Sequence, residues 1–118
     1  MTTTTDYDLV ILGGGAAAFA AITEASRRGF STAVVNTGLP IGGTCVNVGC
    51  VPSKHLLAVA EDGAAASDSP FDAVTHPEKP TVDWAEALDG TDDLVERFRR
   101  ETYVDVAEHF ETDIYEGY

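Results

Sequence analysis

Residues 7–36 read YDLVILGGGAAAFAAITEASRRGFSTAVVN and carry the strongest fold signal in the chain. Their first six residues, YDLVIL, form a near-continuous aliphatic run of strand length, which is typical of a strand buried in a parallel sheet. Three glycines follow, and the alanine-rich segment after them predicts a helix that Gly29 caps at its C-terminal end. Residues 32–35, TAVV, predict a second short buried strand. The order strand, glycine-rich turn, helix, strand indicates the first βαβ unit of a doubly wound α/β sheet.

The pattern Gly13-x-Gly15-x-x-Ala18 lies between the first strand and the helix, where a dinucleotide-binding turn places its glycines. Gly13 permits the tight turn, Gly15 allows the backbone to approach a pyrophosphate, and Ala18 keeps the helix close to the sheet. The pyrophosphate would lie at the helix N-terminus, where free N–H groups and the helix dipole favour an anion. The alternative interpretation is a glycine-rich turn that binds no ligand.

The second predicted strand is followed by Asn36, at a place where such a unit usually carries an acidic residue that binds the ribose hydroxyls. An amide also donates to and accepts from a hydroxyl group, so ribose binding remains feasible. Because the charged acceptor is absent at this position, we expect a lower affinity for the ribose.

The part of the chain after this unit predicts a helix, a loop and a further strand. Residues 44–66 predict a helix that Gly49 and Pro52 interrupt near its start. Residues 67–81 hold three of the five prolines and predict a surface loop. Residues 112–118 predict the beginning of a strand.

A second long helix is predicted to begin at Asp83. Asp83 is followed three residues later by Glu86, a spacing that resembles a helix-capping box. The helix that follows would carry its acids on one face and a stripe of mostly apolar side chains on the other: Trp84, Leu88, Val95, Phe98 and Thr102.

The charge of the chain is unevenly distributed. The net charge is −13, yet the first 60 residues hold three acids and three bases, and the remaining residues hold 17 acids and four bases. An acid-rich surface with few lysines disfavours binding to nucleic acid or to an anionic membrane. It favours a protein of a halophile, whose high-salt cytoplasm screens the repulsion between acids. The alternative is an acidic face that binds a partner protein.

Neither a membrane span nor a secretion signal is predicted. The longest apolar run, residues 9–22, is 14 residues long and contains three glycines, so it is too short to cross a bilayer as a helix. The first eight residues contain two acids and no base, which disfavours a signal peptide. Two cysteines without such a signal disfavour a disulfide-stapled extracellular scaffold. We therefore expect a cytoplasmic protein.

Cys45 and Cys50 lie in the segment GGTCVNVGCVPSK. In a regular helix, residues five apart are separated by about 7.5 Å of rise alone, whereas a disulfide requires Cα atoms within roughly 7 Å. A bridge between the two would need a distorted turn, which Gly49 and Pro52 favour. At a helix N-terminus the dipole lowers the pKa of a thiol, and Lys54 adds positive charge on the same helical face as Cys50.

Two other interpretations of the cysteines remain open. They could be buried structural residues, a common role of a free cysteine. A zinc site is a poorer alternative, because a C-x4-C pair is half a site. The three histidines, His55, His76 and His109, have no spacing that would complete it, and we interpret them as surface or core residues.

The segment GGTCVNVGCVPSK resembles the redox-active segment of the flavin disulfide reductases, and the resemblance is greatest to the mercuric branch of that family. Dihydrolipoamide dehydrogenases resemble it with small changes around the cysteines, and glutathione-type reductases tend to have a second lysine in place of Ser53. The turn GGGAAAFAA is also similar to that of the mercuric branch. The resemblance covers essentially all of residues 1–118, which we expect to be the N-terminal segment of an FAD-binding domain.

The resemblance implies an FAD site and a redox disulfide between Cys45 and Cys50. In this family Cys50 would be the thiolate stacked against the flavin, and Cys45 would exchange with the substrate. Two electrons would pass from NADPH to FAD and then to the disulfide. In the mercuric branch the two thiolates would bind Hg(II) transiently, before its reduction to Hg(0). The residues implied at the FAD are Gly13, Gly15, Ala17, Ala18, Asn36 and Gly38, with Gly43, Thr44 and Lys54 near the flavin.

The resemblance also implies parts that residues 1–118 do not contain. These are the NADPH-binding domain, the homodimerisation domain with its catalytic histidine, and the C-terminal cysteine pair of the mercuric branch. We therefore expect a truncated chain that is inactive alone. The alternatives are a fragment of a dihydrolipoamide dehydrogenase and a non-catalytic module that binds flavin or thiols.

Overall fold

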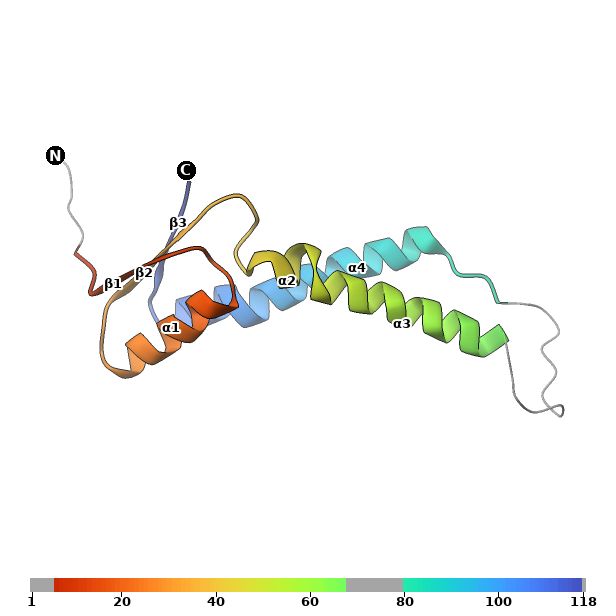
Figure 1. Cartoon of the computed structure of the whole chain (residues 1–118), viewed down its shortest axis with the longest axis horizontal. Coiled ribbons are helices and arrows are strands. Elements are labelled where there is room, and N and C mark those ends of the chain that lie inside the picture. Colours follow the sequence, from red (N-terminus) through yellow and green to blue (C-terminus); the bar gives the residue numbers. More distant parts are fainter. Residues whose placement is uncertain (1–5, 68–79, 118) are drawn as a thin grey trace.

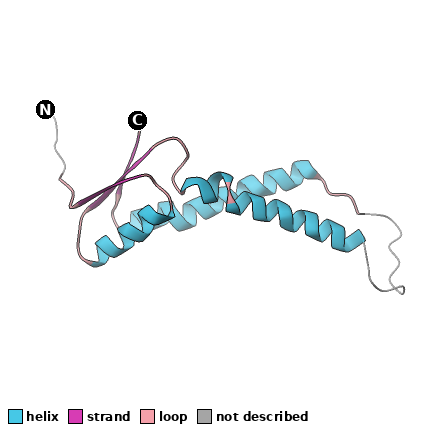
Figure 2. Ribbon diagram, in the orientation of Figure 1, coloured by secondary structure: helices cyan, strands magenta, loops and turns pink. Residues whose placement is uncertain are grey.

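The computed structural model describes residues 6–67 and 80–117, which form an α/β structure with a small sheet at one end and a long helical hairpin projecting from it (Figures 1 and 2). Most of the loop predicted over 67–81 lies outside the described residues. In chain order the elements are β1 (Leu9–Leu12), α1 (Ala16–Arg27), β2 (Thr32–Asn36), α2 (Gly43–Val48), α3 (Cys50–Ser67), α4 (Trp84–Arg99), a π-helical turn η1 (Arg100–Val104), α5 (Asp105–His109) and β3 (Asp113–Glu116).

The three strands form one parallel sheet in the order β1-β2-β3. In the register, Val34 pairs with Ile11 on one side and with Ile114 on the other. The predicted βαβ unit is confirmed, although β1 starts two residues later than predicted and β2 extends to Asn36. The strand predicted over 112–118 is confirmed as β3.

Helices α1 and α5 lie on the same face of the sheet (Figure 1). The core forms between these helices, β2, α2 and η1, from Ala18, Phe19, Ile22, Val34, Ile41, Val46, Tyr103 and Ala107. The prediction that the first strand is buried on both faces is wrong for this part of the chain. Val10 and Leu12 are 52% and 83% exposed, because no described element covers the other face and β1 lies at the sheet edge.

The predicted end of the first helix is confirmed. Helix α1 ends at Arg27, and Gly29 follows with φ +77°, the left-handed conformation that glycine adopts without strain. The N–H of Gly29 donates to the carbonyl of Ser26 at 3.0 Å and that of Phe30 to the carbonyl of Ala25 at 3.1 Å. These bonds satisfy carbonyl groups that the last helical turn would otherwise leave unpaired.

Helices α3 and α4 form the hairpin, and the start of α4 is the predicted one. The Asp83 carboxylate accepts from the N–H groups of Ala85 at 3.0 Å and Glu86 at 3.2 Å. The predicted apolar stripe, however, is packed only in part: Trp84 and Leu88 are 51% and 53% exposed, whereas Val95 is partly buried against the core. The buried residues of α4 are the small Ala87 and Thr91, which allow α3 and α4 to approach closely.

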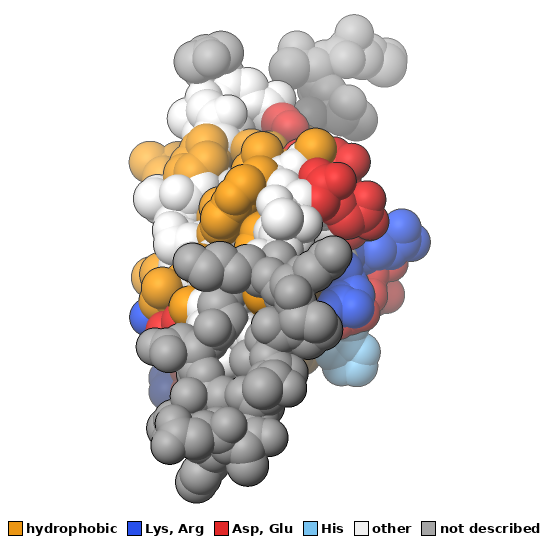
Figure 3. All heavy atoms as spheres, turned by 90° about the vertical axis from the view of Figure 1, so that its right-hand side faces the viewer, with side chains coloured by type: hydrophobic (Ala, Val, Ile, Leu, Met, Phe, Trp, Pro, Cys, Tyr) orange, Lys and Arg blue, Asp and Glu red, His pale blue; other side chains and the backbone are white. Residues whose placement is uncertain are grey.

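Hydrophobic and acidic side chains are separated on the surface of the molecule (Figure 3). In the end view of Figure 3, hydrophobic side chains form a band on one side and acidic side chains gather on the other. Asp92 and Asp93 on α4 are exposed, as the predicted acidic face requires. The adaptation to high salt stays a prediction. Within residues 6–67 and 80–117, no helix is both long and apolar enough to span a membrane.

Candidate functional site

The glycine turn between β1 and α1 has the predicted geometry. Gly13 adopts φ +97°, and its N–H donates to the Val35 carbonyl at 2.8 Å, which fastens the turn to β2. Gly15 is the N-cap of α1, and no side chain caps the helix. The first N–H groups of α1 are therefore available to an anion. Of the other residues predicted here, Ala17 is exposed in the first turn of α1 and Ala18 is buried against the core.

The central glycine of the turn, Gly14, has a role that the sequence pattern missed. A Cβ atom at this position would lie 2.2 Å from Ile41 Cδ1 and 2.8 Å from Asn36 Oδ1. The carbonyl of Gly14 also accepts from the N–H of Gly42 at 2.7 Å. Local sequence holds no signal for this requirement, because the crowding atoms come from segments more than 20 residues away.

The cysteine segment begins directly on the glycine turn. Gly43 has φ +71°, and a Cβ atom on it would lie 2.9 Å from Gly15 Cα. The two backbones thus touch, and a side chain at Gly43 would separate them. Two regions that the sequence singled out independently, the glycine turn and the cysteine segment, form one site.

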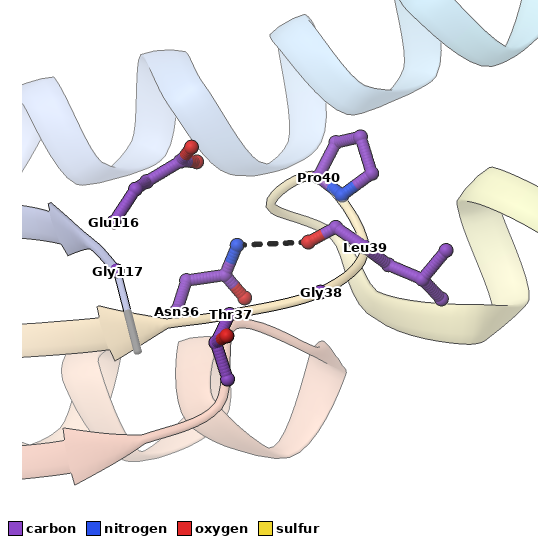
Figure 4. A pocket seen from close by; sticks show the side chains of 7 residues that line it. All are labelled: Asn36, Thr37, Gly38, Leu39, Pro40, Glu116 and Gly117. Atoms are coloured by element: carbon purple, nitrogen blue, oxygen red, sulfur yellow. Dashed lines mark hydrogen bonds between the residues drawn. The ribbon is translucent and has the colours of Figure 1, made fainter.

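Asn36 lies at the end of β2 and is buried, which modifies the role predicted for it. Its Nδ2 donates to the Leu39 carbonyl at 2.9 Å and holds the loop that follows β2 (Figure 4). The loop and the end of β3 line a pocket of about 380 Å³, which includes Gly38 with φ +85°. This bond uses one of the two N–H groups of the Asn36 amide, so the other N–H and Oδ1 can still meet a ligand.

Glu116 on β3 places a carboxylate beside the end of β2, where Asn36 stands instead of an acidic residue. It pairs with Asn36 in the sheet register, and both side chains rise on the same side of the sheet into this pocket (Figure 4). The Gly117 N–H donates to the Asn36 carbonyl at 3.1 Å and fixes the two strand ends. The sequence could not identify Glu116, because the register of β3 against β2 depends on tertiary packing.

Cys45 lies in α2, and Cys50 is the first residue of α3. The predicted interruption is confirmed at Gly49, whose φ of −123° and ψ of −112° end α2. A Cβ atom on Gly49 would lie 3.0 Å from the Thr44 carbonyl oxygen and 3.2 Å from Cys45 Cα, so a side chain here would push the backbone of α2 slightly away. Pro52 does not cause the distortion, because it lies in the first turn of α3, where no helical hydrogen bond is lost.

The two cysteines are free thiols, exposed and within hydrogen-bonding reach of one another. The bond between the thiols favours the neutral form and raises the pKa of Cys45, with desolvation by the surrounding atoms as a second cause. The N–H of Cys50 acts in the opposite direction but is outweighed. The expectation that both thiols have a lowered pKa is therefore wrong for Cys45 in the reduced pair, because the hydrogen bond with the Cys50 thiol raises its pKa.

The raised pKa of Cys45 predicts a dependence of its reactivity on Cys50. Replacing Cys50 with alanine removes the hydrogen bond that stabilises the neutral thiol, so the pKa of Cys45 should fall. At about pH 8 the thiolate fraction, and with it the rate of alkylation by iodoacetamide, should rise several-fold. Rates measured against pH by mass spectrometry test this, with Ser53→Ala as the control. An equal or higher apparent pKa in Cys50→Ala would contradict it.

Lys54 and Cys50 line one pocket of about 410 Å³ between α3 and α4. Thr44, the remaining predicted residue near the flavin, is exposed in α2 beside Cys45. His55 also borders the pocket, and its Nδ1 lies 2.7 Å from Thr91 Oγ1. Because the Thr91 hydroxyl donates to the Ala87 carbonyl at 2.7 Å, His55 Nδ1 is the donor in this contact. This supports the interpretation of His55 as a packing residue.

Tyr103 is a further neighbour of the cysteines that the sequence did not indicate. It lies on the π-helical turn η1, is buried, and packs edge-on against Phe19 with 4.8 Å between ring centroids. Burial raises the pKa of Tyr103, and the charge of a Cys45 thiolate raises it further. The extra residue of a π-turn shifts the following side chains around the helix, and such turns often occur at functional sites.

Comparisons with known proteins agree with this arrangement. A family model described as pyridine nucleotide-disulphide oxidoreductase matches residues 7–116. The chain is 47% identical over 115 residues to a mercuric reductase of Streptomyces lividans, covering 96% of this chain and 24% of that protein. It is 40% identical over 112 residues to a mercuric reductase of Staphylococcus aureus, covering 95% and 20%. It is 40% identical over 89 residues to dihydrolipoyl dehydrogenase 3 of Pseudomonas putida, covering 75% and 19%.

The chain spans about a fifth of the length of the curated relatives it matches. Among solved structures, it is similar to the HOCl-induced flavoprotein disulfide reductase RclA of Escherichia coli, determined as a Cu(II) complex. The TM-score is 0.74 at 23% identity, over 97% of this chain and 22% of that one. This likeness supports the predicted α/β fold class.

Proposed function

This chain belongs to the pyridine nucleotide-disulphide oxidoreductase family, and we propose on that premise that it forms the N-terminal part of an FAD-dependent mercuric reductase. The family is one of oxidoreductases that use a flavin and a pyridine nucleotide. In the whole protein, two electrons from NADPH would pass through FAD to a disulfide between Cys45 and Cys50 and finally to Hg(II). The overall reaction converts NADPH and Hg(II) to NADP⁺, a proton and Hg(0).

One observation carries this proposal: the glycine turn and the cysteine segment are in direct contact. The N–H of Gly42 donates to the Gly14 carbonyl at 2.7 Å, three residues before Cys45. A pyrophosphate at the N-terminus of α1 would therefore lie beside the start of α2. The contact between a dinucleotide-type turn and the segment that carries two adjacent thiols supports a single cofactor site shared by both.

The residues present fit the ADP part of FAD. The uncapped N-terminus of α1, with Gly13 and Gly15 before it, would hold the pyrophosphate. Oδ1 of Asn36 and the carboxylate of Glu116 would accept from the adenosine ribose in the 380 Å³ pocket, where Gly38 leaves room. When bound, FAD supplies the two-electron carrier between NADPH and the disulfide.

The residues proposed at the flavin end lie around the cysteine pair. Gly43, Thr44 and Lys54 would border the flavin, and Lys54 lines the same pocket as Cys50. Cys50 is the proposed thiolate beside the flavin and Cys45 the thiol that exchanges with substrate. Two adjacent thiols are also soft ligands suited to Hg(II).

The choice of substrate rests on similarity to the relatives, because thiols bind Hg(II) and attack disulfides alike. The mercuric substrate is favoured by relatives of 47% and 40% identity along nearly the whole chain. The second candidate is a dihydrolipoamide substrate, since dihydrolipoyl dehydrogenase 3 is 40% identical over 89 residues. A flavin- or thiol-binding module without turnover is the third.

A chimera tests the proposed function. Residues 1–118 would replace the matching segment of the Streptomyces lividans mercuric reductase, to which they are 47% identical. We expect the chimera to purify with bound FAD and to oxidise NADPH when Hg(II) is added, releasing mercury vapour. A folded chimera without FAD would contradict the cofactor site, and one with FAD but no NADPH oxidation by Hg(II) would contradict the role of this redox pair.

The 118-residue chain alone is expected to bind FAD weakly, because Cys45, Cys50 and Lys54 are exposed and leave the flavin end of the site uncovered. Gel filtration of the chain with FAD should separate the two, and a stoichiometric yellow complex would refute this.

In the chimera, Glu116→Gln should weaken FAD binding about tenfold, because a charged acceptor is lost. Glu108→Gln, which removes an exposed acid outside the pocket, is the matched control.

The remaining expectations stay predictions. They are a homodimeric whole protein, a cytoplasmic location, and no binding to nucleic acid or membrane. The high-salt origin inferred from the acidic composition also stays a prediction.

A further inference from the structure

Asn47 lies between the two cysteines, and its side chain ties α2 to the loop that precedes it. Its Nδ2 donates to the Pro40 carbonyl at 2.8 Å and to the Gly43 carbonyl at 2.9 Å. That loop continues into Gly42, which is hydrogen-bonded to the glycine turn. Asn47 therefore fastens the helix that carries Cys45 to the proposed cofactor turn.

Arg99 reaches the same asparagine from α4. Its Nη1 donates to Asn47 Oδ1 at 3.2 Å, and its Nη2 pairs with the Glu96 carboxylate one turn earlier. The Arg99 side chain is only 22% exposed, so its guanidinium is held in place at two nitrogens. The side chain of its neighbour Arg97 is exposed and forms no ion pair or hydrogen bond with any of the described residues.

Helix α2 has few other anchors. It contains six residues, no side chain caps its start, and Val46 is its one buried residue. A helix this short does not hold its conformation by itself, because it forms too few hydrogen bonds to offset the entropy lost when its first turn is ordered. The position of Cys45 therefore depends on tertiary contacts, and the hydrogen bond from Arg99 to Asn47 is a polar contact of this kind.

We propose that Arg99 is a positioning residue that acts through Asn47 to hold Cys45 against Cys50. The proposal rests on the proposed function only in taking the pair to cycle between dithiol and disulfide. The tendency to form the disulfide depends on the effective concentration of one thiol at the other. If α2 is released from α4, this concentration falls and the dithiol becomes favoured.

Oxidised glutathione provides the measurement. Its sulfur–sulfur bond breaks, a bond forms between Cys45 and Cys50, and the two protein thiol protons pass to two molecules of reduced glutathione. The 118-residue chain would be equilibrated with glutathione mixtures of different ratio and then alkylated. Mass spectrometry gives the fractions of dithiol and disulfide, and hence the equilibrium constant.

In this assay Arg99→Ala should lower the equilibrium constant for disulfide formation about five- to tenfold, where tenfold corresponds to about 30 mV. Asn47→Ala should have a similar effect, and the double variant should equal the single ones, because both residues belong to one chain of contacts. Arg99→Lys keeps a charged donor and should restore part of the constant. Arg97→Ala, the matched control on α4, should stay within about twofold of the unchanged chain.

Several results would overturn the proposal. An Arg99→Ala constant equal to that of Arg97→Ala would exclude a role for Arg99, and additive effects of Arg99→Ala and Asn47→Ala would exclude the path through Asn47. Far-ultraviolet circular dichroism monitors folding. If Arg99→Ala is unfolded, Arg99→Lys is measured in its place. A folded Arg99→Lys chain with the same equilibrium constant for disulfide formation as the unchanged chain refutes the proposal. If the unchanged chain forms no disulfide, the proposed function and this inference both fail, whereas an unshifted Arg99→Ala overturns the inference alone.

Discussion

Replacing Gly14 with alanine is expected to destabilise the chain by about 2 kcal/mol, the usual scale for overpacking a filled site. The new Cβ atom would lie 2.2 Å from Ile41 Cδ1 and 2.8 Å from Asn36 Oδ1, and both of these residues are buried. Relief of the contact would move Ile41 out of the core or separate Asn36 from the loop that it holds. Urea unfolding followed by far-ultraviolet circular dichroism gives the change in the free energy of unfolding.

Two variants make this test specific. Ile41→Val removes Cδ1, the nearest atom, so Gly14→Ala should cost less stability in the Ile41→Val chain than in the unchanged one. Gly90→Ala is the matched control, because a Cβ atom there meets only His55 Cε1 at an ordinary 3.6 Å. Gly90 lies within α4, where alanine is favoured over glycine by about 1 kcal/mol, so this variant should be more stable. A Gly14→Ala midpoint at or above that of the unchanged chain would contradict the role of Gly14.

The second large effect concerns the division of labour between the cysteines and is measured in the chimera. Cys50→Ser should abolish the long-wavelength absorbance between thiolate and flavin, because Cys50 is the proposed donor sulfur. Cys45→Ser should keep that absorbance. Both variants should lose NADPH oxidation by Hg(II) completely, since neither leaves a redox-active pair.

The assignment of roles fails if the absorbance survives in Cys50→Ser or disappears in Cys45→Ser while FAD remains bound. Ser53→Ala, three residues after Cys50, serves as the control for a small change in the same segment. Its absorbance and activity should equal those of the unchanged chimera. The flavin content of each variant, measured after denaturation, separates loss of the sulfur from loss of the cofactor.

Local sequence was sufficient for the elements themselves. The βαβ unit follows from an aliphatic run, three glycines and an alanine-rich stretch, and Gly29 ends the helix as predicted. Asp83 caps α4, and Gly49 interrupts the cysteine segment. These features depend on interactions within a few residues of one another, such as helical hydrogen bonds, caps and backbone dihedral angles, so the order of residue types along the chain specifies them.

Tertiary structure decided which of these elements meet, and with that the details of the site. Gly14 is required because Ile41 and Asn36 fold against it, and Glu116 enters the pocket because β3 pairs with β2 in one register. Arg99 reaches Asn47 across 52 residues, and the pKa of Cys45 rises because the chain folds Cys50 back onto it. The exposure of Leu12 likewise depends on which faces of the sheet are covered. Each of these properties is a contact between segments distant in sequence, and no pattern within a single segment encodes the geometry of such a contact.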